Sequence, residues 1–134
     1  MQFTSFPRSG NSFLRRCFEQ VSGTPTGSTM PLHTATSLQI MGMKGEGYID
    51  ENVWVIKSHH PMTVMPNQST FSATKTFVCV RNPLDVFPSY AAFLNTMSHG
   101  NKPEFEPSSE HPEWWTWWVK NTASHMKRFF NTLI

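Results

Sequence analysis

The fold class is decided at residues 1–22, which read MQFTSFPRSGNSFLRRCFEQVS. Residues 1–6 predict a short strand, and residues 7–11 interrupt it with proline, glycine and polar side chains. Apolar residues then recur at spacings of three and four, which is typical of one face of a helix. They are Phe13, Leu14, Cys17, Phe18 and Val21. We therefore predict a strand, a tight polar turn and a helix over 12–21.

Two further segments predict strands of a parallel sheet. Residues 52–57 and 76–81 are apolar nearly throughout, as in strands that are covered on both faces. A helix is expected to follow the second strand, with Asn82 as its N-cap and Pro83 at its first position. A last helix is expected at 113–133. Strands that alternate with helices predict an α/β fold, a three-layer P-loop-like domain with a parallel sheet and flanking helices.

Length and composition restrict the class of protein. The chain has 134 residues, enough for one domain, which we expect to span residues 1–134. Charged residues make up 15% of the chain and aromatic residues 13%, whereas a disordered chain has many charged and few aromatic residues. A net charge of +2 is too small to indicate nucleic-acid binding, and no stretch reaches the roughly 20 apolar residues of a membrane span. Cys17 and Cys79 lie in apolar segments and are expected to be free thiols.

The turn between the first strand and the first helix has the composition of an anion site. A helix N-terminus presents unpaired N–H groups, and Gly10 lets the backbone wrap closely around a phosphate. Arg8 adds a cation, while Ser9 and Ser12 add hydroxyl donors. The turn is not a Walker A loop, because no Gly-Lys-Ser/Thr occurs. An ordinary strand-to-helix turn with a surface arginine is the alternative.

A second candidate anion site follows the strand at 76–81. Arg81 ends that strand, and Ser89 lies eight positions further on, near the first turns of the next helix. An arginine and a hydroxyl that converge at a strand end can hold a phosphate. The alternative is a salt bridge between Arg81 and Asp85 at the helix start.

A third polar group ends the strand at 52–57. Lys57 and His59 are two positions apart, so on an extended segment their side chains point to the same side. Histidine can accept a proton near neutral pH, and lysine can stabilise negative charge on a leaving oxygen. The doublet of His59 and His60 does not predict a metal site, because no third ligand is suitably spaced. Histidines without a catalytic role are the alternative.

These three groups gain weight together. Each lies at the carboxyl end of a predicted strand, hence at one edge of the sheet. Two anion sites that flank a lysine–histidine pair suit a nucleotide with two separated phosphate groups.

The motifs resemble those of the sulfotransferases that use 3′-phosphoadenosine 5′-phosphosulfate (PAPS). Residues 4–13 look like the 5′-phosphosulfate loop of that family, residues 55–61 like its central segment, and residues 81–90 like its 3′-phosphate motif. The resemblance is closest to the cytosolic members. It implies transfer of a sulfuryl group from PAPS to a hydroxyl or amine acceptor, without a metal.

The resemblance also implies the site residues. His59 would take the proton of the acceptor, while Arg8 and Lys57 stabilise charge on the departing oxygen. Arg81 and Ser89 would hold the 3′-phosphate. The 5′ side would be held by Arg8, Ser9, Gly10, Asn11, Ser12 and Phe13.

The chain departs from the family after Ser89. No later Arg-Lys-Gly segment and no further strand are found, so the expected domain is the N-terminal part of a sulfotransferase domain, incomplete at its C-terminus. A truncated, inactive nucleotide-binding module is the alternative. The expected partner is a small-molecule or glycan acceptor, and the expected location is cytoplasmic, or Golgi if an N-terminal anchor is missing.

Overall fold

The computed structural model places most of the chain and divides it into two compact units, Met1–Val80 and Arg81–Ile134. Each unit is described by itself. The structure describes residues 1–31, 36, 38–59, 71–97 and 107–133.

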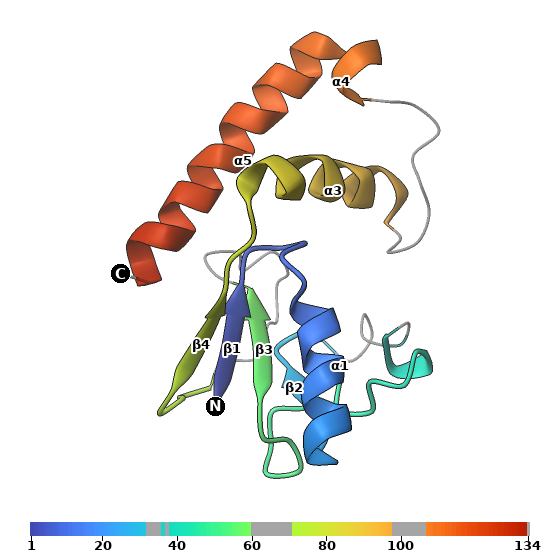
Figure 1. Cartoon of the computed structure of the whole chain (residues 1–134), viewed down its shortest axis with the longest axis vertical. Helices are drawn as coiled ribbons and strands as arrows, with labels where there is room; N and C mark the ends of the chain where they lie inside the picture. Colours follow the sequence, from blue (N-terminus) through green and yellow to red (C-terminus); the bar gives the residue numbers. More distant parts are fainter. Residues whose placement is uncertain (32–35, 37, 60–70, 98–106, 134) are drawn as a thin grey trace. The chain divides into compact units, whose positions relative to one another are not determined.

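The first unit is built on a four-stranded parallel sheet in the order β2-β3-β1-β4 (Figure 1). Its strands are β1 (Gln2–Ser5), β2 (Gly27–Ser28), β3 (Ile56–His59) and β4 (Thr76–Cys79). The predicted α/β class and parallel sheet are therefore confirmed.

The register aligns the carboxyl ends of three strands. Ser5 of β1 is paired with His59 of β3 on one side and with Cys79 of β4 on the other. The loops that leave these strands therefore start at the same edge of the sheet. Ligands of open parallel sheets bind at this edge.

Helix α1 (Asn11–Ser22) packs on the sheet and confirms the predicted strand–turn–helix unit. The rings of Phe3 on β1 and Phe18 on α1 meet edge to face, with centroids 5.5 Å apart. The predicted apolar face is wrong in part, because Phe13 is 72% and Val21 91% exposed. The fully buried side chains of α1 are polar, as described below for the functional site.

The predicted strand over 52–57 starts later than expected and ends at His59. Val53 and Val55 are buried, but they lie in the loop before β3, where the N–H of Trp54 donates to the carbonyl of Pro25 at 3.4 Å. These valines are apolar because they are buried, not because they belong to the strand. The two-residue strand β2 carries no apolar side chain and was not predicted.

Two glycines allow the turn at 43–48 to approach β2 closely. A Cβ on Gly27 would lie 2.2 Å from the carbonyl oxygen of Tyr48, and one on Gly45 would lie 2.5 Å from that of Thr26. The N–H of Ser28 donates to the same Tyr48 oxygen at 3.1 Å. The turn is therefore fixed against the sheet by backbone contacts that only glycine permits.

The second unit begins with the predicted helix start. Helix α3 (Pro83–Thr96) has Asn82 as its N-cap, and the Asn82 side chain accepts a hydrogen bond from the N–H of Leu84 at 3.0 Å. Pro83 occupies the first turn, where no N–H donor is needed. The helix continues past Pro88, which lies inside it.

Helices α4 (Pro107–Glu110) and α5 (Pro112–Leu133) complete the second unit. Trp118 of α5 is buried against α3, with ring centroids 6.3 Å from Phe87 and 5.9 Å from Tyr90. Met126 and Phe129 extend the same buried face. Trp114 and Trp117 are exposed.

The substitution Gly45→Ala should destabilise the first unit by roughly 1–3 kcal/mol, the usual cost of overpacking, because the new methyl meets backbone and the Val53 side chain. Chemical denaturation measures the free energy of unfolding. The exposed neighbour Lys44, changed to alanine, is the control and should leave it nearly unchanged. Equal effects of the two substitutions would contradict the close approach.

Candidate functional site

The turn after β1 has the backbone geometry of an anion-binding loop. Arg8 and Gly10 both take left-handed conformations, with φ of 67° and 96°. The N–H of Ser9 donates to the carbonyl of Phe6 at 3.3 Å and closes the turn. Left-handed geometry is costly for arginine, so the surrounding structure must hold it there. Such outliers are concentrated at functional sites.

The N-terminus of α1 follows this turn directly. Gly10 is its N-cap, and no side chain makes a capping hydrogen bond. The first N–H groups of a helix carry partial positive charge and suit an anion when no side chain caps them. Ser12 is partly buried on the first turn, and Phe13 beside it is 72% exposed, which leaves its ring open to a stacking partner.

Asn11 fastens the start of α1 to β1. Its side-chain N–H₂ donates to the carbonyl of Phe3 at 3.3 Å and to the hydroxyl of Ser5 at 3.0 Å. The residue is 4% exposed, and its Oδ1 has no hydrogen-bond partner among the described residues. A buried acceptor of this kind is costly unless a donor group reaches it.

Cys79 supports the loop from the neighbouring strand. Its thiol donates to the carbonyl of Ser9 at 3.1 Å, and burial raises its pKa, which keeps the group protonated. Cys17 and Cys79 are both free and partly buried.

Lys57 and His59 lie on the face of the sheet that α1 covers. Lys57 is paired with Phe3, which contacts α1, and His59 is paired with Ser5, which contacts Asn11. The expectation that the two side chains share one side is confirmed. Lys57 is 6% exposed, and His59 is partly buried.

The contacts of His59 define its tautomer. Nδ1 lies 3.0 Å from the carbonyl oxygen of Ser5 and 3.4 Å from its hydroxyl. A carbonyl oxygen can only accept, so Nδ1 carries the hydrogen and Nε2 keeps its lone pair. The ring is therefore oriented with Nε2 as its basic nitrogen.

Electrostatics keeps this imidazole neutral. Burial, followed by the charges of Lys57 and Arg15, lowers the pKa of His59 to about 3, against the opposing effect of its hydrogen bond to Ser5. Burial likewise lowers the pKa of Lys57, while the carboxylate of Glu46 raises it. The structure thus holds an unprotonated histidine next to a buried lysine.

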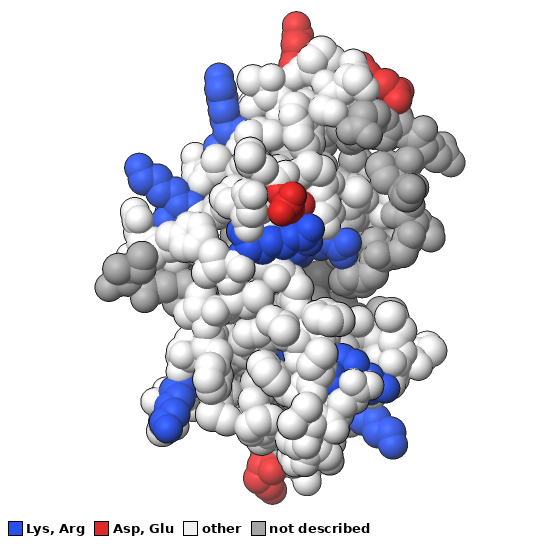
Figure 2. All heavy atoms as spheres, in the orientation of Figure 1, with Lys and Arg blue, Asp and Glu red and all other residues white. Residues whose placement is uncertain are grey.

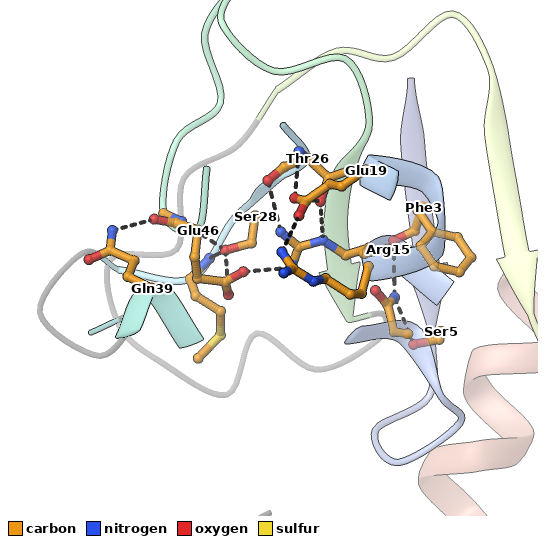
Figure 3. Close-up of polar contacts among 12 residues, drawn as sticks. Phe3, Ser5, Arg15, Glu19, Thr26, Ser28, Gln39 and Glu46 are labelled. Atoms are coloured by element: carbon orange, nitrogen blue, oxygen red, sulfur yellow. Dashed lines mark hydrogen bonds and ion pairs between the residues drawn. The ribbon is translucent and has the colours of Figure 1, made fainter. Parts of the chain in front are cut away.

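A buried polar network joins α1, β2 and the turn at 43–48 (Figure 3). Arg15 of α1 donates to Glu46 at 2.5 Å, to the hydroxyl of Thr26 at 2.9 Å and to the Thr26 carbonyl at 2.9 Å. Ser28 donates to the second oxygen of Glu46 at 2.8 Å. Arg15 and Glu46 are both fully buried. On the face of the molecule shown in Figure 2, most of the described residues are uncharged.

This network was missed in the sequence. The apolar spacing of the helix favoured Phe13 and Val21 for the buried face and gave no role to Arg15. The detectable pattern was the polar series Asn11, Arg15 and Glu19, at intervals of four on one side of the helix. Nothing in the sequence alone pairs Arg15 with Glu46.

Arg81 and Ser89, predicted for the second anion site, lie in the second unit. Arg81 is exposed and immediately precedes the N-cap Asn82, and Ser89 is partly buried in the second turn of α3. Both residues predicted for the second anion site therefore lie near the capped start of α3. His60 and Pro61 of the central motif lie outside the described residues.

Within the described residues, no group of three or more histidine, cysteine or carboxylate side chains is arranged to hold a metal. No described helix combines the length and the apolar character needed to cross a membrane.

Comparison with known families matches the sulfotransferase domain over residues 4–132, nearly the whole chain. The chain therefore belongs to the sulfotransferase domain family. Its predicted class, a transferase of the sulfotransferase type on a parallel α/β sheet, is confirmed. Searches of curated proteins and of solved structures give no match.

The neutral state of His59 gives a direct test. Its ring signals in NMR should stay those of a neutral imidazole down to about pH 4, because the folded pKa is about 3. In the urea-unfolded chain the same ring should titrate near pH 6.5. The unfolded chain therefore binds the proton more readily, and this residue destabilises the fold as pH falls below 6.5. A folded-state titration near pH 6.5 would contradict the assigned environment.

Proposed function

We propose that this chain binds PAPS and transfers its sulfuryl group to a hydroxyl or amine acceptor. The observation that carries the proposal is the in-register meeting of Ser5 with His59 at the sheet edge. This pairing places the neutral histidine, at the end of β3, next to the end of β1, from which the chain enters the loop and the uncapped N-terminus of α1.

The loop is proposed to hold the 5′ side of the donor. Its left-handed backbone and the uncapped N–H groups of α1 supply hydrogen bonds to a phosphate, and Arg8 and Ser12 supply side-chain donors. The exposed ring of Phe13 offers a stacking face for adenine. The remaining loop residues of this binding set are Ser9, Gly10 and Asn11.

Selection of PAPS over other adenine nucleotides is proposed to come from its 3′-phosphate. Arg81 can form a two-pronged contact with a phosphate, and Ser89 can add a hydroxyl donor. A helix start with Asn82 as its cap supports this proposal, because it fixes the segment that carries both residues.

The proposed reaction is one in-line displacement at sulfur. The acceptor oxygen or nitrogen forms a bond to sulfur, and its proton passes to Nε2 of His59. The bond between sulfur and the bridging oxygen breaks, and adenosine 3′,5′-bisphosphate departs with the electron pair. Lys57 and Arg8 stabilise the negative charge that develops on that oxygen. Positioning and preorganised charge supply the remaining rate acceleration.

The low pKa of His59 is compatible with this task. At neutral pH the ring is unprotonated and can accept the acceptor's proton. The charge of Lys57 contributes to the low value, and an anionic donor beside Lys57 would offset that charge. Donor binding therefore raises the basicity of His59 when it is needed.

The acceptor is proposed to be a small molecule or glycan that carries a hydroxyl or amine. The cytoplasmic location stays a prediction.

The proposal is tested by following transfer of radiolabelled sulfur from PAPS to a panel of phenols, alcohols, amines and sugars. His59→Ala should lower the transfer rate by about 10²–10⁴-fold, the usual effect of removing a general base. Binding of adenosine 3′,5′-bisphosphate, measured by calorimetry, should persist.

The control is Ser58→Ala, next in sequence on the opposite face, where Ser58 contacts Gln2. It should leave transfer intact. Turnover retained by His59→Ala would exclude His59 as the base, and no transfer by the unaltered chain to any acceptor would contradict the activity.

The strained arginine separates binding from folding. Arg8→Gly relieves the positive φ and removes the cation, and chemical denaturation measures the effect on the free energy of unfolding separately from the effect on binding. Affinity for adenosine 3′,5′-bisphosphate should fall about tenfold or more, the usual value of a charged hydrogen bond. Arg16→Ala, which removes an exposed charge from the helix that follows the loop, should leave affinity nearly unchanged. Equal losses in the two variants would show that only net charge matters.

A further inference from the structure

The α1 face of the sheet carries a buried charge cluster beyond the proposed catalytic pair. Arg15 and Glu46 are fully buried, and Lys57 is 6% exposed. Buried charges are rare unless they are paired, because transfer from water costs several kcal/mol for each ion. Glu46 is the fully buried carboxylate of this cluster, and it is paired with Arg15.

Strand pairing places the carboxylate of Glu46 beside the register partner of Lys57. Ser28 of β2 is the register partner of Lys57 in β3, and neighbouring residues in register share one face of a sheet. The hydroxyl of Ser28 donates to Oε1 of Glu46 at 2.8 Å. The N–H of Thr29 donates to the carbonyl of Lys57 at 3.0 Å, which fixes the two strands at this position.

The carboxylate of Glu46 has little freedom to move. Arg15 holds Oε2 at 2.5 Å, and Ser28 holds Oε1. The backbone carbonyl of Glu46 accepts from the side chain of Gln39 at 2.8 Å, and its N–H donates to the carbonyl of Met43 at 3.1 Å. Both ends of the residue are therefore anchored.

We propose that Glu46 is a positioning residue for Lys57, and that its carboxylate, clamped by Arg15 and Ser28 on the same face of the sheet, keeps the lysine ammonium charged for catalysis. This inference rests on the proposed function of Lys57. Glu46 itself touches neither donor nor acceptor in this account.

The electrostatics agrees with the geometry. Burial lowers the pKa of Lys57 most, Glu46 raises it, and Arg15 lowers it. His59 lies two positions further along the same strand, and the charges of Lys57 and Arg15 both lower its pKa. Without Glu46, Lys57 would face burial and the unpaired charge of Arg15 together, and both disfavour the ammonium form.

Glu19 provides a matched control in the same network. It lies on α1, one turn beyond Arg15, and accepts from the N–H and hydroxyl of Thr26 at 2.9 and 2.8 Å. Its carboxylate is nearly buried but does not contribute to the shift in the pKa of Lys57. Loss of its charge should therefore affect stability without affecting Lys57.

The test follows the titration of Lys57 by NMR in protein with isotopically labelled lysine Cε, with Lys57→Arg used to assign the signal. Glu46→Gln should lower the titration midpoint by about one pH unit or more, the usual effect of losing a nearby opposite charge. Glu19→Gln should leave it unchanged, and Glu46→Asp should restore part of the shift. An unchanged midpoint in Glu46→Gln would overturn the proposal.

The unaltered protein supplies a second measurement, which decides the question if Glu46→Gln does not fold. With labelled glutamate, the Cδ signal of Glu46 should show an inflection at the midpoint of Lys57. Absence of that inflection would overturn the proposal. Neither NMR readout needs turnover, so failure of the proposed transfer activity would be seen separately.

In an active preparation, the alkaline limb of the kcat–pH profile should move to lower pH in Glu46→Gln by the same amount as the Lys57 midpoint. A purely structural effect would lower kcat equally at every pH. That uniform loss, or an equal displacement in Glu19→Gln, would overturn the positioning role.

Discussion

The buried ion pair between Arg15 and Glu46 is the interaction on which the first unit depends. It joins α1 to the turn at 43–48, and its side contacts to Thr26 and Ser28 include β2 in the same connection. Removal of one partner from a buried pair leaves an uncompensated charge and typically costs 3–5 kcal/mol. The pair therefore obliges helix, turn and edge strand to keep one arrangement.

That arrangement places the loop chemistry. Asn11 joins the first turn of α1 to β1. Arg15 joins its second turn to Thr26, directly before the edge strand β2. The uncapped helix N-terminus is thus held from two directions. Lys57 and His59 lie on the strand between those two anchors. An anion bound at the loop therefore meets a fixed lysine and a fixed base, which is the condition for catalysis by positioning.

Local patterns predicted the elements that depend on neighbouring residues. The turn at 7–11 and the N-cap Asn82 have short-range causes, and the structure confirms both. The start of β3 was misplaced because burial of Val53 gives the same apolar pattern as a strand. Arg15 and Glu46 are 31 positions apart, and a pair at that separation leaves no periodic pattern. The buried arginine, which contradicts the apolar face expected for α1, could come only from the three-dimensional arrangement.

In the proposed function, the N-terminus of α1 binds the 5′ side of a nucleotide that also carries a 3′-phosphate. Backbone amide NMR during titration with adenosine 3′,5′-bisphosphate tests it most directly, with adenosine 5′-monophosphate as the comparison. We expect saturable shifts at the amides of 9–13, with clearly weaker binding of the monophosphate. Shifts confined to other residues, or equal affinity for the two nucleotides, would contradict it.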